Sequence, residues 1–154
     1  MKYLDEINTP EKMKAYLEDV STVGWIASKL PQTTFHNTRD VLSLYFEDSV
    51  IEKHNLHNIS PEIKEALLKW FYENQDPDTG LWGPKSKSGK LRKKDVSNTK
   101  SILETFVNYD GKDIYDSYKL RYKDKLADSM LEEFDELINN LPEDDELDEW
   151  HEWN

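Results

Sequence analysis

The stretch that follows Ser60 places the tightest limit on how this chain of 154 residues can fold. Ser60 can accept hydrogen bonds at a helix N-terminus, and Pro61 suits the first helical position. Five apolar residues then recur at i, i+3, i+4, i+7 and i+8, namely Ile63, Ala66, Leu67, Trp70 and Phe71. This spacing predicts a helix with one buried face. The helix must end before Asp76, because a residue that precedes proline is pushed out of the α region.

Four other stretches show helical periodicity, and together they predict an all-α chain. We expect these helices to start at about residues 9, 37, 95–97 and 115, the third to end at residues 110–111 and the last at residue 141. The expected buried face of the first of these helices is Met13, Tyr16, Leu17 and Val20, and that of the second is Val41, Leu42, Tyr45 and Phe46, with Ile51 as a candidate. The expected face of the third helix is Ile102, Leu103, Phe106 and Val107. The expected face of the last helix is Tyr118, Tyr122, Leu126, Met130, Phe134, Leu137 and Leu141. We expect one helical domain, residues 1–141, followed by an acidic tail, residues 142–154.

The formal net charge of −12 is confined to one end of the chain. Residues 1–125 contain 20 acidic and 20 basic residues, whereas residues 126–154 contain 12 acidic residues and no Lys or Arg. A nucleic-acid-binding protein needs a net basic face, so this distribution argues against that class. We expect the acidic end to engage a basic protein partner or another copy of the chain, with Trp150 and Trp153 as anchors.

The chain has no cysteine, which excludes disulfides, thiolate metal sites and cysteine nucleophiles. No apolar run approaches the roughly 18 residues that a membrane-spanning helix needs. The first residues lack an apolar signal core. These features predict a cytoplasmic protein that has no membrane span, and we expect no cofactor.

The most distinctive run is residues 70–83, Trp-Phe-Tyr-Glu-Asn-Gln-Asp-Pro-Asp-Thr-Gly-Leu-Trp-Gly. A Gln amide can bond to backbone at a helix end, an Asp-Pro-Asp-Thr-Gly sequence favours a tight turn, and a Trp ring can cover the seam between helices. The run resembles the helix-ending repeats of α/α-toroid proteins, which include terpene cyclases and protein prenyltransferase β subunits. The resemblance covers about residues 59–111 and implies an α/α toroid.

The motif occurs once, and a closed toroid needs several helical pairs of about 40 to 50 residues each. The resemblance therefore implies a partial α/α toroid, a fragment of a longer protein or an open array of helical hairpins. No catalytic residue of the family is carried over, since the sequence has neither an Asp-x-Asp-Asp motif nor a cysteine for a zinc set.

Two short patterns have the spacing of metal ligands. Asp144, Asp145 and Asp148 match Asp-Asp-x-x-Asp, and His54 and His57 lie one helical turn apart. The first pattern lies within an acidic run, where such a match arises by chance. The second has no evident third ligand. We therefore interpret them as a solvated tail and a polar helix end, and we predict no metal site.

Polar and aromatic side chains near predicted helix ends are the pocket candidates: Trp25, His36, Arg39, Asp40, Trp70 and Trp82. The first four could converge where an irregular segment enters a helix, although capping and ion pairing would also explain Arg39 and Asp40. The two later tryptophans could form an aromatic wall for a sugar or an isoprenoid, and core packing is the alternative.

Residues 85–94 form a polar loop with six basic residues and no acidic one, and we call it the basic loop: Lys85, Lys87, Lys90, Arg92, Lys93 and Lys94. It could bind an anion, and the acidic end of this chain or of a neighbouring copy is a ready partner.

Two functions follow from these patterns. The first is a non-catalytic helical binding or structural domain, and we prefer it because no acid, base, nucleophile or metal set stands out. The second is part of an α/α-toroid enzyme that acts on an isoprenoid or a carbohydrate, so the question of catalysis stays open.

Overall fold

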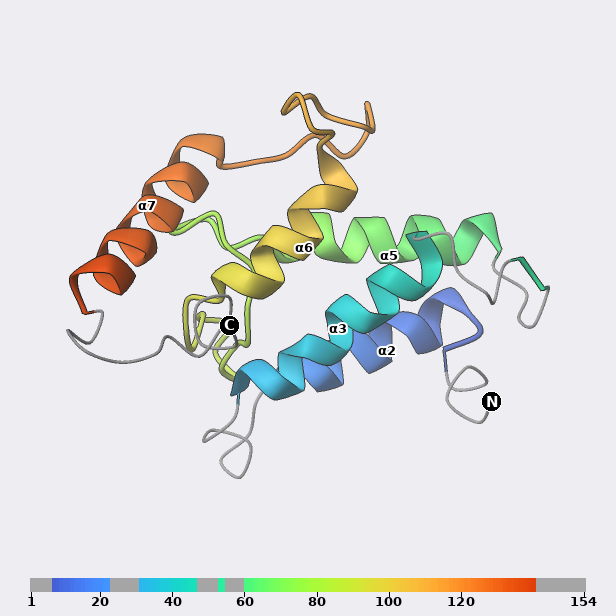
Figure 1. Cartoon of the computed structure of the whole chain (residues 1–154). Helices are drawn as coiled ribbons and strands as arrows, with labels where there is room; N and C mark the ends of the chain where they lie inside the picture. Colours follow the sequence, from blue (N-terminus) through green and yellow to red (C-terminus); the bar gives the residue numbers. More distant parts are fainter. Residues whose placement is uncertain (1–6, 23–30, 47–52, 55–59, 141–154) are drawn as a thin grey trace.

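The computed structural model describes residues 7–22, 31–46, 53–54 and 60–140. These residues form the helices α2 (Pro10–Ser21), α3 (Pro31–Phe46), α5 (Pro61–Asn74), α6 (Val96–Phe106) and α7 (Lys123–Asn139) (Figure 1). Within these ranges, β structure is limited to isolated bridges between single residues. The prediction of an all-α chain is therefore confirmed.

Three of the helices begin with proline. The Thr9 side chain accepts a hydrogen bond from the Lys12 amide at 3.3 Å, and the Ser60 side chain accepts one from the Ile63 amide at 3.3 Å, so both predicted caps form. The third case, Pro31, corrects the predicted start near residue 37 by six residues. Proline is as suitable at the first position of α3 as it is in α2 and α5, and the polar run that follows it is helical.

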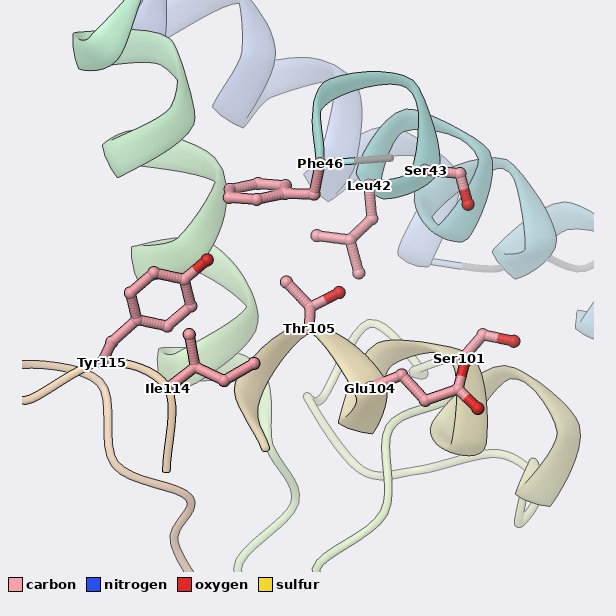
Figure 2. Close-up of a pocket in the computed structure, with 8 residues that line it drawn as sticks. All are labelled: Leu42, Ser43, Phe46, Ser101, Glu104, Thr105, Ile114 and Tyr115. Carbon is pink, nitrogen blue, oxygen red and sulfur yellow. The ribbon is translucent and has the colours of Figure 1, made fainter. Parts of the chain in front are cut away.

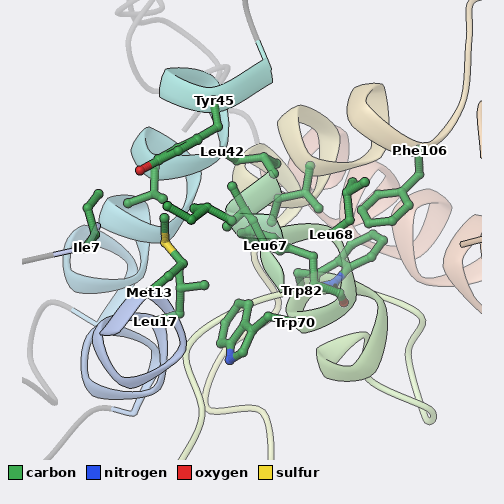
Figure 3. Packing of buried hydrophobic residues seen from close by; sticks show 14 of the residues in the cluster. Ile7, Met13, Leu17, Leu42, Tyr45, Leu67, Leu68, Trp70, Trp82 and Phe106 are labelled. Carbon is green, nitrogen blue, oxygen red and sulfur yellow. Dashed lines mark hydrogen bonds between the residues drawn. The ribbon is translucent and has the colours of Figure 1, made fainter. Parts of the chain in front are cut away.

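Helix α3 lies at the centre of the fold and contacts α2, α5 and α6, while α2 also packs against α5 (Figure 1). Apolar side chains from these elements form one buried cluster (Figure 3). The predicted faces of α2 and α5 supply much of it: Met13, Leu17, Ile63, Leu67, Trp70 and Phe71. Of the other predicted residues, Val41, Leu42, Tyr45, Ile102 and Phe106 are also buried there, and Phe46 packs partly buried against the cluster.

Trp82 fixes the loop after α5 into this core. Its indole nitrogen donates to the Phe71 carbonyl at 2.7 Å, and its ring stacks on Phe106 with 5.8 Å between centroids. The Thr99 hydroxyl accepts from the Trp82 amide and donates to the Trp82 carbonyl, both at 2.9 Å. Burial of a large aromatic side chain removes roughly 150–250 Å² from water, which corresponds to roughly 4–6 kcal/mol. This residue therefore joins α5 to α6.

The turn between α5 and Trp82 forms as the sequence predicts. One carboxylate oxygen of Asp76 accepts from the Thr79 amide and hydroxyl, both at 2.9 Å, and from the Asp78 amide at 3.2 Å. Gly80 closes the turn with a φ of +74°. A side-chain carbon at Gly80 would lie 2.6 Å from the backbone nitrogen of Leu126, so the turn also contacts the first residues of α7 closely.

The predicted helix over residues 115–141 is wrong in its first part, because α7 begins only at Lys123. The preceding segment is held by tertiary contacts that a helix could not make. The Leu120 amide donates to Asp113 at 2.9 Å, and the Arg121 amide donates to Gln75 at 3.2 Å. Tyr122 has a φ of +51°, which interrupts helical geometry. Helix α6 also ends earlier than predicted, at Phe106, and residues 108–111 form a separate turn.

Replacement of Gly80 by alanine should destabilise the protein more than the same change at Gly89. Both glycines have positive φ, +74° and +80°, so each alanine has a left-handed conformation that costs about 1–2 kcal/mol. At Gly80 the new methyl group also meets the Leu126 backbone, which should add about 1–3 kcal/mol, whereas nothing lies within 4 Å at Gly89. Urea unfolding monitored by Trp fluorescence measures both changes, and equal losses would contradict the packing of α7 on this turn.

Candidate functional site

His36, Arg39 and Asp40 lie close together on α3, and His36 contacts the first turn of α6. Nδ1 of His36 lies 3.1 Å from the Asn98 side-chain oxygen. Nε2 of His36 lies 3.4 Å from a guanidinium nitrogen of Arg39 and 3.4 Å from an Asp40 carboxylate oxygen. Because the Asn98 oxygen can only accept, Nδ1 of His36 is the donor in that contact. Trp25, the fourth member of the predicted pocket, lies outside the described residues.

Asp95 completes this cluster from the start of α6. Its carboxylate accepts from the Asn98 amide at 3.0 Å and from the Asn98 side-chain nitrogen at 2.7 Å. Burial raises the pKa of Asp95, and the hydrogen bonds from Asn98 and the positive charges of Lys93 and His36 oppose that shift. The chain of contacts from Asp95 through Asn98 to His36 joins two helices, which gives the cluster a clear structural role.

Trp70 and Trp82 lie in the core with 3% and 1% of their surface exposed. The indole nitrogen of Trp70 donates to a Glu18 carboxylate at 3.0 Å, and that of Trp82 donates to the Phe71 carbonyl. Neither ring lines the surface pocket of the described structure.

That pocket lies between α3, α6 and the segment after α6, and it has a volume of about 240 Å³ (Figure 2). Its lining combines apolar Leu42 and Phe46 with the Glu104 carboxylate, the Thr105 hydroxyl and Tyr115. Burial raises the pKa of Tyr115. The volume is below the roughly 300–1,000 Å³ of most small-molecule sites. None of the described pocket candidates, His36, Arg39, Asp40, Trp70 and Trp82, lines it.

Two cations of the basic loop, Lys85 and Lys94, make contacts with residues outside the loop. Nζ of Lys85 donates to Asn74 at 2.9 Å, and burial lowers the pKa of Lys85 against the opposing charges of Asp76 and Glu18. Nζ of Lys94 pairs with Glu132 at 3.1 Å and Glu133 at 3.0 Å, and these hydrogen bonds raise its pKa. The acidic region of the chain thus supplies a partner for one member of the loop.

The remaining cations of the basic loop, Lys87, Lys90, Arg92 and Lys93, have exposed side chains. Lys93 nevertheless lies close enough to Asp95 to influence that carboxyl. The predicted anchors of the tail, Trp150 and Trp153, and the Asp-Asp-x-x-Asp pattern lie outside the described residues.

Helix α7 presents a surface that sequence reasoning missed. The sequence predicts a buried face along the helix, but of its residues on α7 only Leu126 is buried and Met130 half-buried, while Phe134 and Leu137 are exposed. The side toward the core consists of Leu126, Ser129, Met130 and Glu133. Leu131, Phe134 and Ile138 remain 62%, 58% and 49% exposed, and we call these three residues the outer stripe.

The outer stripe is turned away from the core. Since an α-helix rotates by about 100° per residue, the stripe is centred roughly 120° around α7 from the side formed by Leu126, Ser129, Met130 and Glu133. Figure 1 shows α7 standing apart from the group formed by α2, α3, α5 and α6. An exposed row of large apolar residues with i, i+3 and i+7 spacing is typical of a helix that binds another element.

In the ranges that the structure describes, no cluster of three or more His, Asp or Glu side chains is arranged to hold a metal ion. None of the described helices combines the length and the apolar character needed to cross a membrane.

Comparisons with protein-family models, with curated proteins and with solved structures found no match to this chain. The resemblance to α/α toroids therefore stays a prediction.

The raised pKa of Asp95 predicts a pH dependence of stability. The folded protein holds this proton more tightly than the unfolded chain, so the contribution of Asp95 to the free energy of unfolding is greatest below its ordinary pKa of 3.8. That contribution is lost as the pH rises through the raised value. Because Asp95→Asn has no such titration, its stability relative to the parent should increase across this window. Urea unfolding at a series of pH values measures the difference.

Asp113 serves as a control, because its contribution to stability should depend on pH in the opposite direction. A hydrogen bond from Lys123, together with one from the Leu120 amide, lowers its pKa below 3.8. Its stabilising contribution is therefore present above pH 3.8 and is lost as the pH falls through the lowered value. The free energy of unfolding of Asp113→Asn should therefore fall further below that of the parent as the pH rises through this range. Equal pH slopes for the two variants would contradict the assigned environments.

Proposed function

We propose that this chain is a helical binding domain, without catalysis of its own, that engages a protein partner through α7 and the acidic sequence that follows. The exposure of the outer stripe carries this proposal. Four of the six large apolar side chains that are exposed in the described structure lie on α7: Leu131, Phe134, Leu137 and Ile138. Three of them, Leu131, Phe134 and Ile138, share one side of the helix as the outer stripe, and covering this stripe is favourable because apolar area leaves water on binding.

The charge around the outer stripe supports a basic partner. Nζ of Lys123 pairs with Asp113 at 3.0 Å, and Nζ of Lys125 donates to the Pro77 carbonyl at 2.6 Å, so both lysines of α7 are held near its first turn. Lys94 forms ion pairs with Glu132 and Glu133 of α7, and Glu133 lies on the core side of the helix. Exposed carboxylates, including those of Asp128 and Asp135, lie along the edge of the stripe that is farther from the core side. Such a surface attracts cations and repels another acidic helix.

Self-association through the basic loop has less support, since Lys85 and Lys94 already have partners within the chain. The toroid-enzyme alternative also has less support, because Trp70 and Trp82 are core residues in the described structure and the pocket lies elsewhere. A cytoplasmic location is part of the proposal and rests on the cysteine-free sequence.

Selection of binding peptides from a displayed random library tests this function on the full chain. Enriched peptides should bind the parent and should lose about tenfold or more affinity for the triple variant Leu131→Gln, Phe134→Gln, Ile138→Gln, because apolar anchors supply most of the binding energy. Each affinity can be measured by fluorescence anisotropy. Circular dichroism checks that the variant is folded, which is expected since the three side chains are exposed.

A matched variant of the basic loop, Lys87→Gln, Lys90→Gln, Arg92→Gln, identifies the surface used. It should bind the selected peptides as the parent does. If this variant loses binding and the α7 variant does not, the loop is the interface and the proposal for α7 is wrong. If neither variant changes the affinity of any selected peptide, neither surface has a binding role.

A further inference from the structure

The outer stripe lies next to a line of carboxylates on the same helix. Asp128 is three residues before Leu131, and Asp135 is four residues after it, so both are helical neighbours of that side chain. Asp124 continues the same line toward the N-terminus, and all three side chains are exposed. Within α7, no Lys or Arg follows Lys125. An apolar row therefore runs beside an acidic row, and the two rows overlap around Leu131 and Asp135.

A helix fits this surface better than an extended strand. The backbone groups of α7 are satisfied within the helix, so there is no free edge for strand addition. Side chains at i, i+3 and i+7 form a ridge that the grooves of a second helix can accept. Helix α7 has 17 residues, which gives it a length of about 25 Å. A partner helix of similar length could cover the full outer stripe.

The charge of this surface then indicates which kind of partner helix it would bind. A second copy of α7 that packs antiparallel on the stripe would bring two acidic rows together, and like charges at close range oppose association. An anionic membrane surface would repel the same row. A helix with one apolar face bordered by Lys or Arg would cover the stripe and meet Asp124, Asp128 and Asp135 at its edge.

We infer that the partner segment of this domain is a basic amphipathic α-helix that packs on the outer stripe of α7, with its cations against Asp124, Asp128 and Asp135. This inference rests on the proposed function and names the class of partner. Apolar contact supplies the affinity, and the acidic row supplies orientation and selectivity. The arrangement predicts that both the stripe and the carboxylates affect binding, and that salt weakens the part that depends on charge.

Three labelled synthetic peptides of 17 residues, the length of α7, test the inference by fluorescence anisotropy with the full chain. The first has a leucine face bordered by lysines. The second keeps the leucine face but has glutamate in place of lysine. The third has the composition of the first in an order that destroys the apolar face. The first peptide should bind at least about tenfold more tightly than either of the others, because it alone matches both rows.

Variants locate the binding on α7. Leu131→Gln, Phe134→Gln, Ile138→Gln should weaken binding of the first peptide by about tenfold or more, while Tyr109→Gln, which alters an exposed ring elsewhere, should not. Asp128→Asn, Asp135→Asn should weaken it about two- to fivefold at low salt and less at high salt. Glu11→Gln, Asp19→Asn makes the same charge change on exposed positions of α2 and should leave binding unaltered.

Each other result overturns the inference. Equal binding of the acidic and basic peptides would leave the stripe as a binding surface but remove the selection for cations. Equal binding of the scrambled peptide would show non-specific attraction alone. Sedimentation that reveals self-association lost in the stripe variant would assign the stripe to a second copy. Stripe-dependent binding to phosphatidylcholine vesicles would assign it to a lipid surface. If no designed peptide binds, the inference fails, and the selected library peptides still decide the proposed function.

Discussion

The side-chain amide of Gln75 is the interaction on which the C-terminal half of the structure depends. Its nitrogen donates to the carbonyls of Gly80 and Arg121, both at 2.8 Å, and its oxygen accepts from the Arg121 amide at 3.2 Å. Gln75 is 2% exposed, so each of these groups would lose a hydrogen bond without gaining water if the side chain were removed. One buried residue thereby joins the end of α5, the turn and the segment that leads into α7. Arg121 adds a guanidinium 4.4 Å from the Tyr72 ring centre, which strengthens the same junction.

This junction explains why α7 is oriented as it is. The segment before Lys123 is held in a non-helical conformation by Gln75 and Asp113, and the first turn of α7 is fixed where Leu126 contacts Gly80. The helix continues outward from that point, and the residues of its later turns that are buried or half-buried are Ser129, Met130 and Glu133. Leu131, Phe134 and Ile138 are left on the other side. The binding surface is therefore a consequence of how the helix is anchored, and Lys94 secures the anchored side through Glu132 and Glu133.

Parts of the candidate site could be predicted and parts could not. His36, Arg39 and Asp40 are i, i+3 and i+4 neighbours, so their proximity follows from local helix geometry. Their contact with Asn98 joins residues 62 positions apart and could not be read from spacing. Trp82 could be recognised as a large ring that returns to the core, but its contacts with Thr99, Phe71 and Phe106 depend on tertiary packing. For α7, periodicity predicted one buried face that included Phe134 and Leu137 but not Leu131 or Ile138, and nothing in the pattern indicated that part of this face would be exposed.

The sequence alone determined the helical class, the caps of α2 and α5, the turn at residues 76–80 and the location of the negative charge, because these depend on side chains within a few positions of one another. Tertiary structure decided where α7 begins, which tryptophans are buried and which face of α7 is exposed. Those features depend on contacts between distant residues, such as Gln75 with Arg121 and Gly80 with Leu126. A helix of 17 residues has the same periodicity whichever way it is turned, so only its fixed first turn could set the direction of its apolar face.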